Sequence, residues 1–462
     1  MSPARLIVVG GGISGLAAAW FAAEAGYDVT VLEAGPSVGG KLRVEELAGH
    51  PVDVGAEALL TVRPEGVGLL DALGLTGDRI APLTTSAQVR AGGRNHPLPA
   101  RTAFGIPSSA AAVRESGALS EEAIAAIERE PSLDPLPPLT EDVAVGRLVR
   151  SRLGDEVADR LVEPLLGGVY AGRADELSLR ATIAPLAQRL GDGGSLVEAA
   201  AAVAAGSTRA NGAGPIFTSL RGGLGRLPQA LVASRRFAVR IGVTVRTLSR
   251  TPTGFALECG AVPVAERIEA EAVIVAVPAA KAARLLSGVA PAAATELGAV
   301  ESASMAIVSF AFPTVAGAAG SGLLVGTGER LATKAVTLSS QKWPLGADGL
   351  TLLRASVGRI GETLPLQLDD TDLVELVRRE LRPLLGVTAA PVDARVTRWG
   401  GGLPQYGVGH VDRIARVRSA LADVPGLAAC GAAFDGVGIP ACIGSARAAV
   451  DRVGAAVAAG AH

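Results

Sequence analysis

The first 33 residues contain a glycine motif that fixes how the fold begins. Gly10-Gly-Gly-Ile-Ser-Gly15 follows a predicted strand at residues 5–9, apolar from residue 6, and precedes an alanine-rich stretch at residues 16–25. A second predicted strand at residues 28–32 is followed by Glu33. Strand, glycine turn, helix and second strand in this order predict a βαβ unit, which belongs in a parallel sheet covered by helices.

The glycines of this motif suit a dinucleotide site. Gly10 allows the tight turn, Gly12 lets the backbone approach a pyrophosphate, and Gly15 lets the helix pack on the strand. The N-terminus of the helix offers free N–H groups and a partial positive charge to phosphates. Glu33 can accept hydrogen bonds from ribose hydroxyls. We therefore predict a bound dinucleotide; the alternative is a tight strand–helix turn without a ligand.

Composition excludes several other classes of protein. The 43 basic and 45 acidic residues nearly balance, which argues against a nucleic-acid-binding protein. The three cysteines show no C-x-x-C spacing and the four histidines are scattered, so we expect no disulfide framework and no metal site. Residues 302–328 carry no charge, but Pro313 and several glycines interrupt them, so we predict buried strands rather than a membrane helix.

The middle of the chain changes its pattern. Residues 120–203 are predicted to be helical, with Ser120 capping one helix, Thr140 capping a second over residues 143–153, and a third ending near Pro164. We interpret this stretch as an insertion into an α/β domain. Strands are predicted at 237–248 and 255–259, which we expect to form a meander, and at 272–278, 304–312, 335–339 and 351–357; a helix is predicted at 371–381.

Two further glycine-rich segments indicate which dinucleotide is bound. Residues 33–43 place two adjacent glycines before Lys41 and Arg43, and resemble the second phosphate-contacting segment of glutathione-reductase-type flavoproteins. Ordinary solvated charge is the alternative for these two cations. Residues 431–445 precede an alanine-rich helix whose N-terminus such flavoproteins place near the isoalloxazine ring. Cys442 lies in this segment, and we predict a small buried hydrophobe rather than a redox thiol.

Two motifs are more specific, Gly-Val-Tyr-Ala-Gly at residues 168–172 and Leu-Pro-Gln-Tyr-Gly-Val-Gly-His at residues 403–410. With the glycine motifs, they make the chain resemble, over nearly its whole length, the FAD-dependent protoporphyrinogen/coproporphyrinogen oxidases of haem synthesis. The resemblance implies an α/β fold: a Rossmann-like FAD-binding domain of the glutathione-reductase/amine-oxidase type, a mixed-sheet substrate domain and a helical insertion. The FAD domain is expected at residues 1–80, 206–285 and 416–462, the substrate domain at 81–110 and 286–415, and the helical, membrane-docking-type domain at 111–205.

The resemblance also implies a cofactor site and a substrate site. Val245 aligns with the family's adenine-contacting valine, and Trp399 with its flavin-side tryptophan. For FAD we predict Gly10, Gly11, Gly12, Ile13, Ser14, Gly15, Glu33, Ala34, Gly40, Lys41, Gly55, Ala56, Glu57, Ala58, Val245, Trp399, Val437, Gly438 and Ile439. For the substrate cavity we predict Gly168, Leu324 and Trp343; no catalytic residue is assigned. Plant-type relatives bind a propionate with an arginine where this chain has Ser86-Ala87, so its anchors are sought among Arg63, Arg90, Arg94 and Lys342.

The implied reaction is the oxygen-dependent, six-electron oxidation of coproporphyrinogen III to coproporphyrin III in haem biosynthesis, with release of hydrogen peroxide. The residues around His410 resemble the Gram-positive branch, which favours this substrate over the alternative, protoporphyrinogen IX. An amine oxidase or carotenoid desaturase on the same scaffold is a further alternative, although three Tyr and three Trp leave little for an aromatic cage. A catalytically silent flavin-holding protein is the last. The expected partners are the porphyrinogen, dioxygen and downstream haem-pathway enzymes; the expected location is cytoplasmic, with at most peripheral membrane contact.

Overall fold

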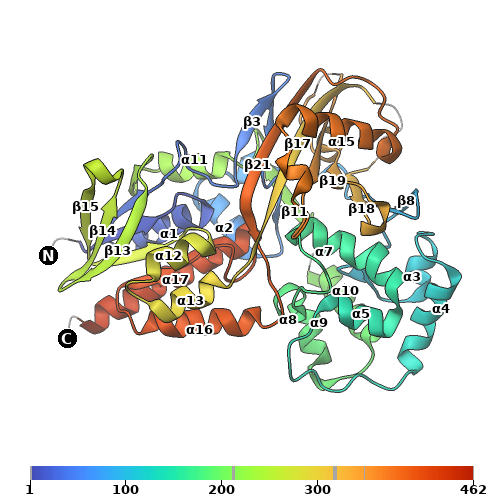
Figure 1. Ribbon diagram of the computed structural model, residues 1–462, viewed down its shortest axis with the longest axis horizontal. Coiled ribbons are helices and arrows are strands. Elements are labelled where there is room, and N and C mark those ends of the chain that lie inside the picture. The colour runs from blue at the N-terminus through green and yellow to red at the C-terminus, as the bar shows by residue number, and fades with distance from the viewer. Residues whose placement is uncertain (1–2, 211–213, 316–319, 348, 461–462) are drawn as a thin grey trace.

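The computed structural model describes residues 3–210, 214–315, 320–347 and 349–460. Figure 1 shows three parts: a sheet with its helices on the left, a second sheet at the upper right, and a helical part at the lower right. Among the described residues, none of the helices combines the length and the apolar character that crossing a membrane requires.

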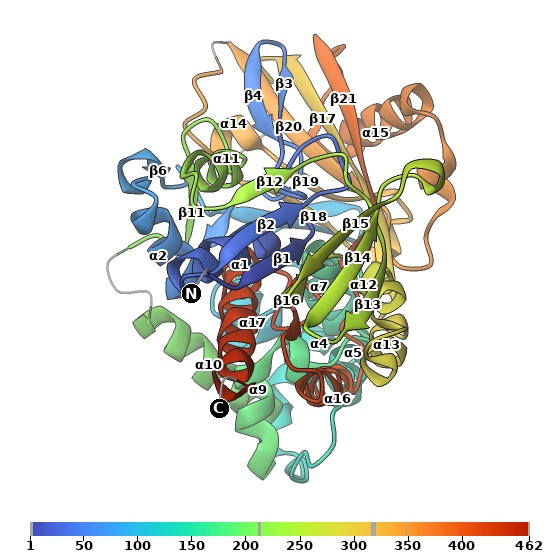
Figure 2. The same ribbon diagram turned by 90° about the vertical axis from the view of Figure 1, so that its left-hand side faces the viewer.

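The first sheet has five parallel strands drawn from distant stretches of the chain, in the order β12, β2, β1, β16, β22. Leu6 and Val8 on one face pack with α1 (Ile13–Glu24) and α17 (Ile439–Gly460), which lie side by side in Figure 2. Ile7 and Val9 on the other face belong to a second core. The predicted βαβ unit is confirmed. The strand bounds, in sheet order, are Ala238–Arg240, Asp28–Leu32, Arg5–Val9, Ala272–Val275 and Leu427–Ala429.

The second core is covered by helices and by a three-stranded antiparallel sheet. The helices are α12 (Ala279–Leu286), α13 (Pro291–Gly298) and α16 (His410–Ala422). The small sheet is β13 (Val245–Thr251), β14 (Gly254–Cys259) and β15 (Glu266–Ala270). Further elements of this region are β3 (Val44–Leu47), β4 (His50–Asp53), β5 (Leu59–Leu60), α2 (Pro64–Ala72), β6 (Arg79–Ile80), β11 (Phe217–Leu220) and α11 (Arg226–Ala233).

The second large sheet is mixed, as predicted, and has the strand order β21, β17, β20, β19, β18, β7, β8. Only β18 and β7 are parallel neighbours. α15 (Asp370–Leu385) packs on one face against Phe310 and Phe312. Residues 316–319 of the glycine-rich turn lie outside the described residues. The strand bounds, in sheet order, are Asp393–Pro404, Ser302–Pro313, Leu350–Val357, Thr333–Thr337, Gly322–Val325, Ala87–Ala91 and Arg94–Pro97; α14 is Ser339–Lys342.

The helical part has its own apolar core, which Tyr170 and Tyr406 join. Ser120 caps α4 as predicted, because its Oγ accepts a hydrogen bond from the N–H of Ala123 at 3.2 Å. A π-helical turn at residues 158–162 joins α6 to α7. The bounds are α3 Ala110–Arg114, α4 Glu121–Arg129, α5 Val145–Leu153, α6 Asp155–Val157, α7 Glu163–Tyr170, α8 Leu179–Thr182, α9 Ala184–Arg189 and α10 Leu196–Ala210; β9 is Thr102–Ala103 and β10 Ile106–Pro107.

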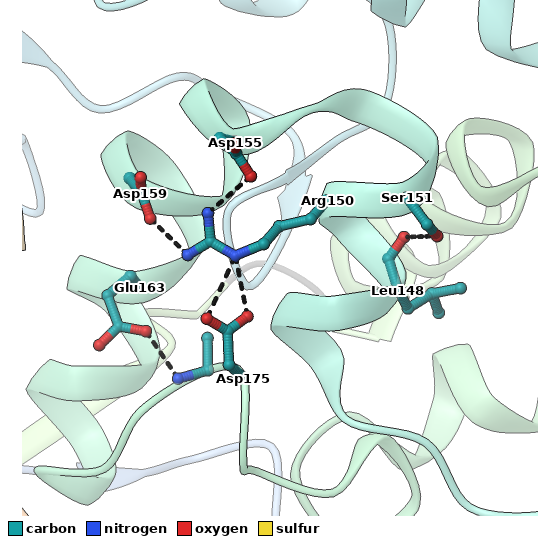
Figure 3. A network of polar contacts seen from close by, with 8 residues as sticks. Leu148, Arg150, Ser151, Asp155, Asp159, Glu163 and Asp175 are labelled. Carbon is teal, nitrogen blue, oxygen red and sulfur yellow. Dashed lines mark hydrogen bonds and ion pairs between the residues drawn. The ribbon is translucent and has the colours of Figure 1, made fainter.

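Arg150 fastens this helical part together. Figure 3 shows its guanidinium group between three carboxylates, with Asp155 Oδ1 at 3.0 Å, Asp159 Oδ1 at 2.5 Å and Asp175 Oδ1 at 2.9 Å. Asp175 belongs to the turn that follows α7, whereas Asp155 and Asp159 precede it. The network therefore holds both ends of α7 against α5.

Three local predictions are wrong. Residues 237–248 are not one strand: Gly242 turns the chain with φ +70°, so β12 joins the parallel sheet and β13 starts a new one. Thr140 does not cap α5, which begins after Ala144. The helix does not end near Pro164, because this proline stands in the first turn of α7, where a missing N–H costs no helical hydrogen bond.

Candidate functional site

The first glycine motif forms an open cradle at the N-terminus of α1. Gly10 has φ +110°, and a Cβ there would lie 2.6 Å from the carbonyl oxygen of Ala276, so only glycine fits. At Gly15 a Cβ would collide with the carbonyl oxygen of Gly10. At Gly12, by contrast, no described atom lies within 4 Å of an added Cβ. The N-terminus of α1, which begins at Ile13, adjoins this open space, as a site for phosphate requires.

Glu33 is held in place at the carboxyl end of β2. Its Oε2 accepts a hydrogen bond from the N–H of Gly11 at 2.7 Å, and its Oε1 accepts one from the N–H of Gly35 at 2.6 Å. The Glu33 carbonyl accepts a hydrogen bond from the N–H of Val243 at 2.8 Å, two residues before Val245 begins β13. The structure thus brings Glu33, Ala34 and the β13 start to one end of the parallel sheet, beside the cradle.

The second glycine segment lies against the first. The N–H of Gly39 donates to the carbonyl of Gly11 at 2.8 Å, and a Cβ on Gly40 would lie 3.2 Å from the Cα of Gly12. The Lys41 side chain is accessible to solvent, yet the protein around it desolvates the amine and lowers its pKa.

Trp399 on β21 lies beside Gly55 and the backbone of Lys41. Its Nε1 donates to the carbonyl of Val54 at 3.0 Å, and a Cβ on Gly55 would lie 3.2 Å from its ring. That Cβ would also collide with the carbonyl oxygen of Lys41, so Gly55 permits this close packing. The N–H of Ala56 donates to the same carbonyl at 3.1 Å.

The C-terminal segment closes the ring of motifs. The N–H of Gly431 donates to Ser445 Oγ at 3.1 Å, and a Cβ on Gly431 would lie 3.9 Å from Ser14 Oγ. Val437 packs on the core of the helical part, Gly438 follows it, and Ile439 begins α17. Cys442 is buried and unbridged as predicted, and burial raises the pKa of its thiol.

Glu57 forms a buried ion triple that the sequence analysis missed. Its Oε1 lies 2.6 Å from Lys342 Nζ and its Oε2 lies 3.1 Å from Arg354 Nε. Burial raises the pKa of the Glu57 carboxyl, but the two cations outweigh it and hold the pKa below its usual value. Arg354 also donates through Nη1 to the carbonyls of Asp53 and Gly55 at 3.0 and 2.6 Å. Glu57 therefore joins the turn after β4 to β20 of the mixed sheet and to α14.

The predicted substrate residues lie at two places. Gly168 on α7 faces Leu324 on β18: a Cβ on Gly168 would lie 3.3 Å from Leu324 Cδ2. Trp343 follows α14 and is 3% exposed, with Lys342 Nζ 5.2 Å from its ring centroid. Two of the suggested propionate anchors already have acidic partners, since Arg90 pairs with Glu329 at 3.2 Å and Lys342 with Glu57.

An aromatic stack joins the two most specific motifs. The rings of Tyr170 and Tyr406 are 5.5 Å apart, and Tyr406 stacks on His410 at 4.1 Å. The Tyr406 hydroxyl donates to the carbonyl of Ala432, next to the C-terminal segment.

Within the described ranges, no group of three or more His, Cys, Asp or Glu side chains could hold a metal ion.

Comparison with known proteins identifies the family. The model of the flavin containing amine oxidoreductases matches residues 13–454. The chain belongs to this family. Coproporphyrinogen III oxidase of Mycobacterium tuberculosis is 40% identical over 98% of each chain, and that of Bacillus subtilis is 33% identical over 96% of this chain and 97% of its own. A solved structure from Exiguobacterium, described provisionally as a protoporphyrinogen oxidase, has a TM-score of 0.87 at 32% identity and covers 98% of this chain and 99% of that one.

The cofactor of this family fits the residues present. The open space over Gly12 and the α1 N-terminus suit a pyrophosphate, and the fixed carboxylate of Glu33 suits ribose hydroxyls. The Lys41 and Trp399 side chains lie close together, because a Cβ on Gly402 would meet both. The chain is thus an FAD-dependent oxidoreductase.

Proposed function

We propose that the protein oxidises coproporphyrinogen III to coproporphyrin III with dioxygen as the final acceptor. The observation that carries this proposal is the 40% identity, over 98% of both chains, with the coproporphyrinogen III oxidase of M. tuberculosis. When bound, FAD supplies a two-electron acceptor that dioxygen restores with release of hydrogen peroxide. The porphyrinogen loses six hydrogens in all, and three dioxygen molecules take them up as three molecules of hydrogen peroxide.

The chain's own residues bind and orient in this proposal. The residues predicted above would hold FAD, and the positive end of α17 would stabilise negative charge on a flavin bound near it. Gly168, Leu324 and Trp343 form apolar walls for the macrocycle. Support for this assignment comes from the convergence of the glycine motifs, residues 33–43, Trp399 and the C-terminal segment. The six-segment division into FAD, substrate and helical domains is part of the same proposal.

Protoporphyrinogen IX is the second candidate substrate, favoured by the description of the Exiguobacterium structure. Initial rates with the two porphyrinogens under air separate the candidates. We expect faster oxidation of coproporphyrinogen III at equal concentration. A clear preference for protoporphyrinogen IX would overturn our choice of substrate and leave the reaction type standing.

Amine oxidation is disfavoured because Tyr170 and Tyr406 are already packed against other side chains. Tyr406 is stacked on His410 and its hydroxyl is occupied, while Tyr170 is 6% exposed and packed in the helical core. Neither ring is free to enclose an amine.

We also propose a cytoplasmic location with at most peripheral membrane contact, which fractionation in low and high salt tests; recovery only with detergent would contradict it.

A further inference from the structure

A cluster of buried charged side chains lies between α7 and the mixed sheet. It contains Lys334 on β19, Arg359 just after β20, and Glu163 at the start of α7. Figure 3 shows Glu163 accepting a hydrogen bond from the turn that follows α7. Lys334 is 1% exposed and Arg359 is 5% exposed. Neither cation has a part in the cofactor site described above.

The cluster has hydrogen-bonding groups that nothing satisfies. Among the described residues, Lys334 Nζ, Arg359 Nε and Glu163 Oε1 have no hydrogen-bond partner. Arg359 donates through Nη2 to the carbonyl of Val325 at 3.0 Å, and its Nη1 lies 3.6 Å from Glu362. Glu362 is 40% exposed and is shared with Arg173 at 3.2 Å. Buried polar groups are almost always paired, so the free donors of two neighbouring cations point to an anionic ligand.

Lys334 owes its place to an irregularity in the sheet. The register of β19 on β20 shifts between Thr333 and Ala335, so Lys334 is the extra residue of a β-bulge. Bulges re-aim a side chain and recur beside active sites. Burial, with a smaller contribution from Arg359, lowers the pKa of Lys334 to about 7, so a nearby anion would restore its charge.

Two glycines connect the cluster with the proposed substrate wall. Gly167 and Gly168 are consecutive residues of α7 without side chains, and each adjoins a different neighbour. A Cβ on Gly168 would meet Leu324 Cδ2, and a Cβ on Gly167 would lie 3.8 Å from Arg359 Nε. The free donor of Arg359 is therefore one residue along α7 from the contact between Gly168 and Leu324.

We propose that Arg359 and Lys334 bind a carboxylate of the substrate, which is a propionate if the proposed function holds. The carboxylate reaches past Gly167 and Gly168 of α7 and accepts hydrogen bonds from Arg359 Nε and Lys334 Nζ. This site replaces the arginine that plant-type relatives have where this chain has Ser86-Ala87. Arg90 and Lys342 remain paired with glutamates. The inference rests on the proposed function and specifies one anchor of its substrate.

Equilibrium binding of coproporphyrin III, the four-carboxylate product, to the FAD-loaded protein tests the inference. Arg359→Met and Lys334→Met should each raise Kd about tenfold, the scale of one charge-assisted hydrogen bond, without loss of FAD. The tetramethyl ester of coproporphyrin III, which has no free carboxylate, should bind wild type and both variants alike. Arg173→Met is the matched control: it removes an exposed cation that shares Glu362 with Arg359, and Kd should stay within about twofold.

Two outcomes overturn the inference in different ways. If wild type and both variants bind coproporphyrin III equally well, the cluster is not the anchor, although the proposed function stands. If the FAD-loaded wild type binds neither coproporphyrin III nor its ester, the proposed function falls and takes the anchor with it. Lys334→Met keeps the test usable if Arg359→Met does not fold, because methionine fills a buried site of similar length without a charge.

Discussion

Gly12 is the residue at which the cofactor assignment can be tested most simply. Because no described atom lies within 4 Å of a Cβ there, a side chain at this position meets no protein atoms but fills the space over the α1 N-terminus. Gly12→Glu should therefore fold and lose bound FAD, since both its volume and its charge oppose a pyrophosphate. The measurement is the visible flavin absorbance per protein after gel filtration.

Gly68→Glu is the matched control for that change. Gly68 is an exposed glycine on α2 whose Cβ would also meet no described atom within 4 Å. This variant should keep its flavin. Retention of stoichiometric FAD by Gly12→Glu would contradict our assignment of the first glycine turn.

Burial of Lys334 should make the stability of the fold depend on pH. Its pKa falls from 10.5 to about 7 on folding, so between these values the unfolded chain holds a proton that the folded chain has released. The free energy of unfolding therefore rises with pH between about pH 7 and pH 10.5. Below about pH 7 Lys334 is protonated in both states, so the folded protein bears the full cost of burying the cation. Lys334→Met should raise the thermal midpoint by at least a few degrees at about pH 6, and by much less at about pH 9. A midpoint difference independent of pH would show that the lysine is not buried as a cation.

Residues whose role is local could be predicted from the sequence, and residues whose role depends on distant partners could not. Gly10, Gly12 and Glu33 act within one βαβ unit, so a short motif is enough to predict their roles. Glu57 was predicted as a cofactor residue through the family resemblance, not as a member of an ion triple. Its partners lie on distant segments, Lys342 on α14 and Arg354 on β20, and the residues around Glu57 give no sign of them.

At the scale of elements, hydrophobic runs located most strands and helices but missed how they join. The π-helical turn before Pro164 gave no sequence signal, so the helix was predicted to stop too early. The run at 237–248 hid the turn at Gly242, because both halves are equally apolar. The bulge that places Lys334 depends on the register between β19 and β20, which a single strand does not encode.

The Glu57 triple ties β20 and α14 to the turn after β4, and this link has a measurable strength. Arg354→Met leaves a buried carboxylate with one cation and two carbonyls without a donor, which should cost about 3–5 kcal/mol in the free energy of unfolding. Adding Glu57→Gln should recover part of that loss. Urea denaturation of the single and double variants measures both quantities.

An exposed ion pair provides the comparison. Arg267→Met breaks a contact with Glu269 in which both side chains are more than half exposed, and the free energy of unfolding should change by less than about 1 kcal/mol. If the losses for Arg354→Met and Glu57→Gln simply add, the two residues do not act as a pair.

At the scale of the whole molecule, the site exists because distant segments meet. The parallel sheet takes strands from both ends of the chain, and this brings the first glycine motif beside the C-terminal one. β21 then carries Trp399 from the mixed sheet to Val54. The resemblance predicted this meeting, whereas composition and periodicity alone predicted only the first βαβ unit and a mixture of strands and helices.

The central claim is that a porphyrinogen delivers its electrons to FAD held in this fold. The direct test is to mix the FAD-loaded protein with coproporphyrinogen III without oxygen and follow the flavin absorbance. The account predicts bleaching of the flavin, and, once air is admitted, three molecules of hydrogen peroxide for each coproporphyrin III formed. A flavin that stays oxidised in the presence of both coproporphyrinogen III and protoporphyrinogen IX would contradict it.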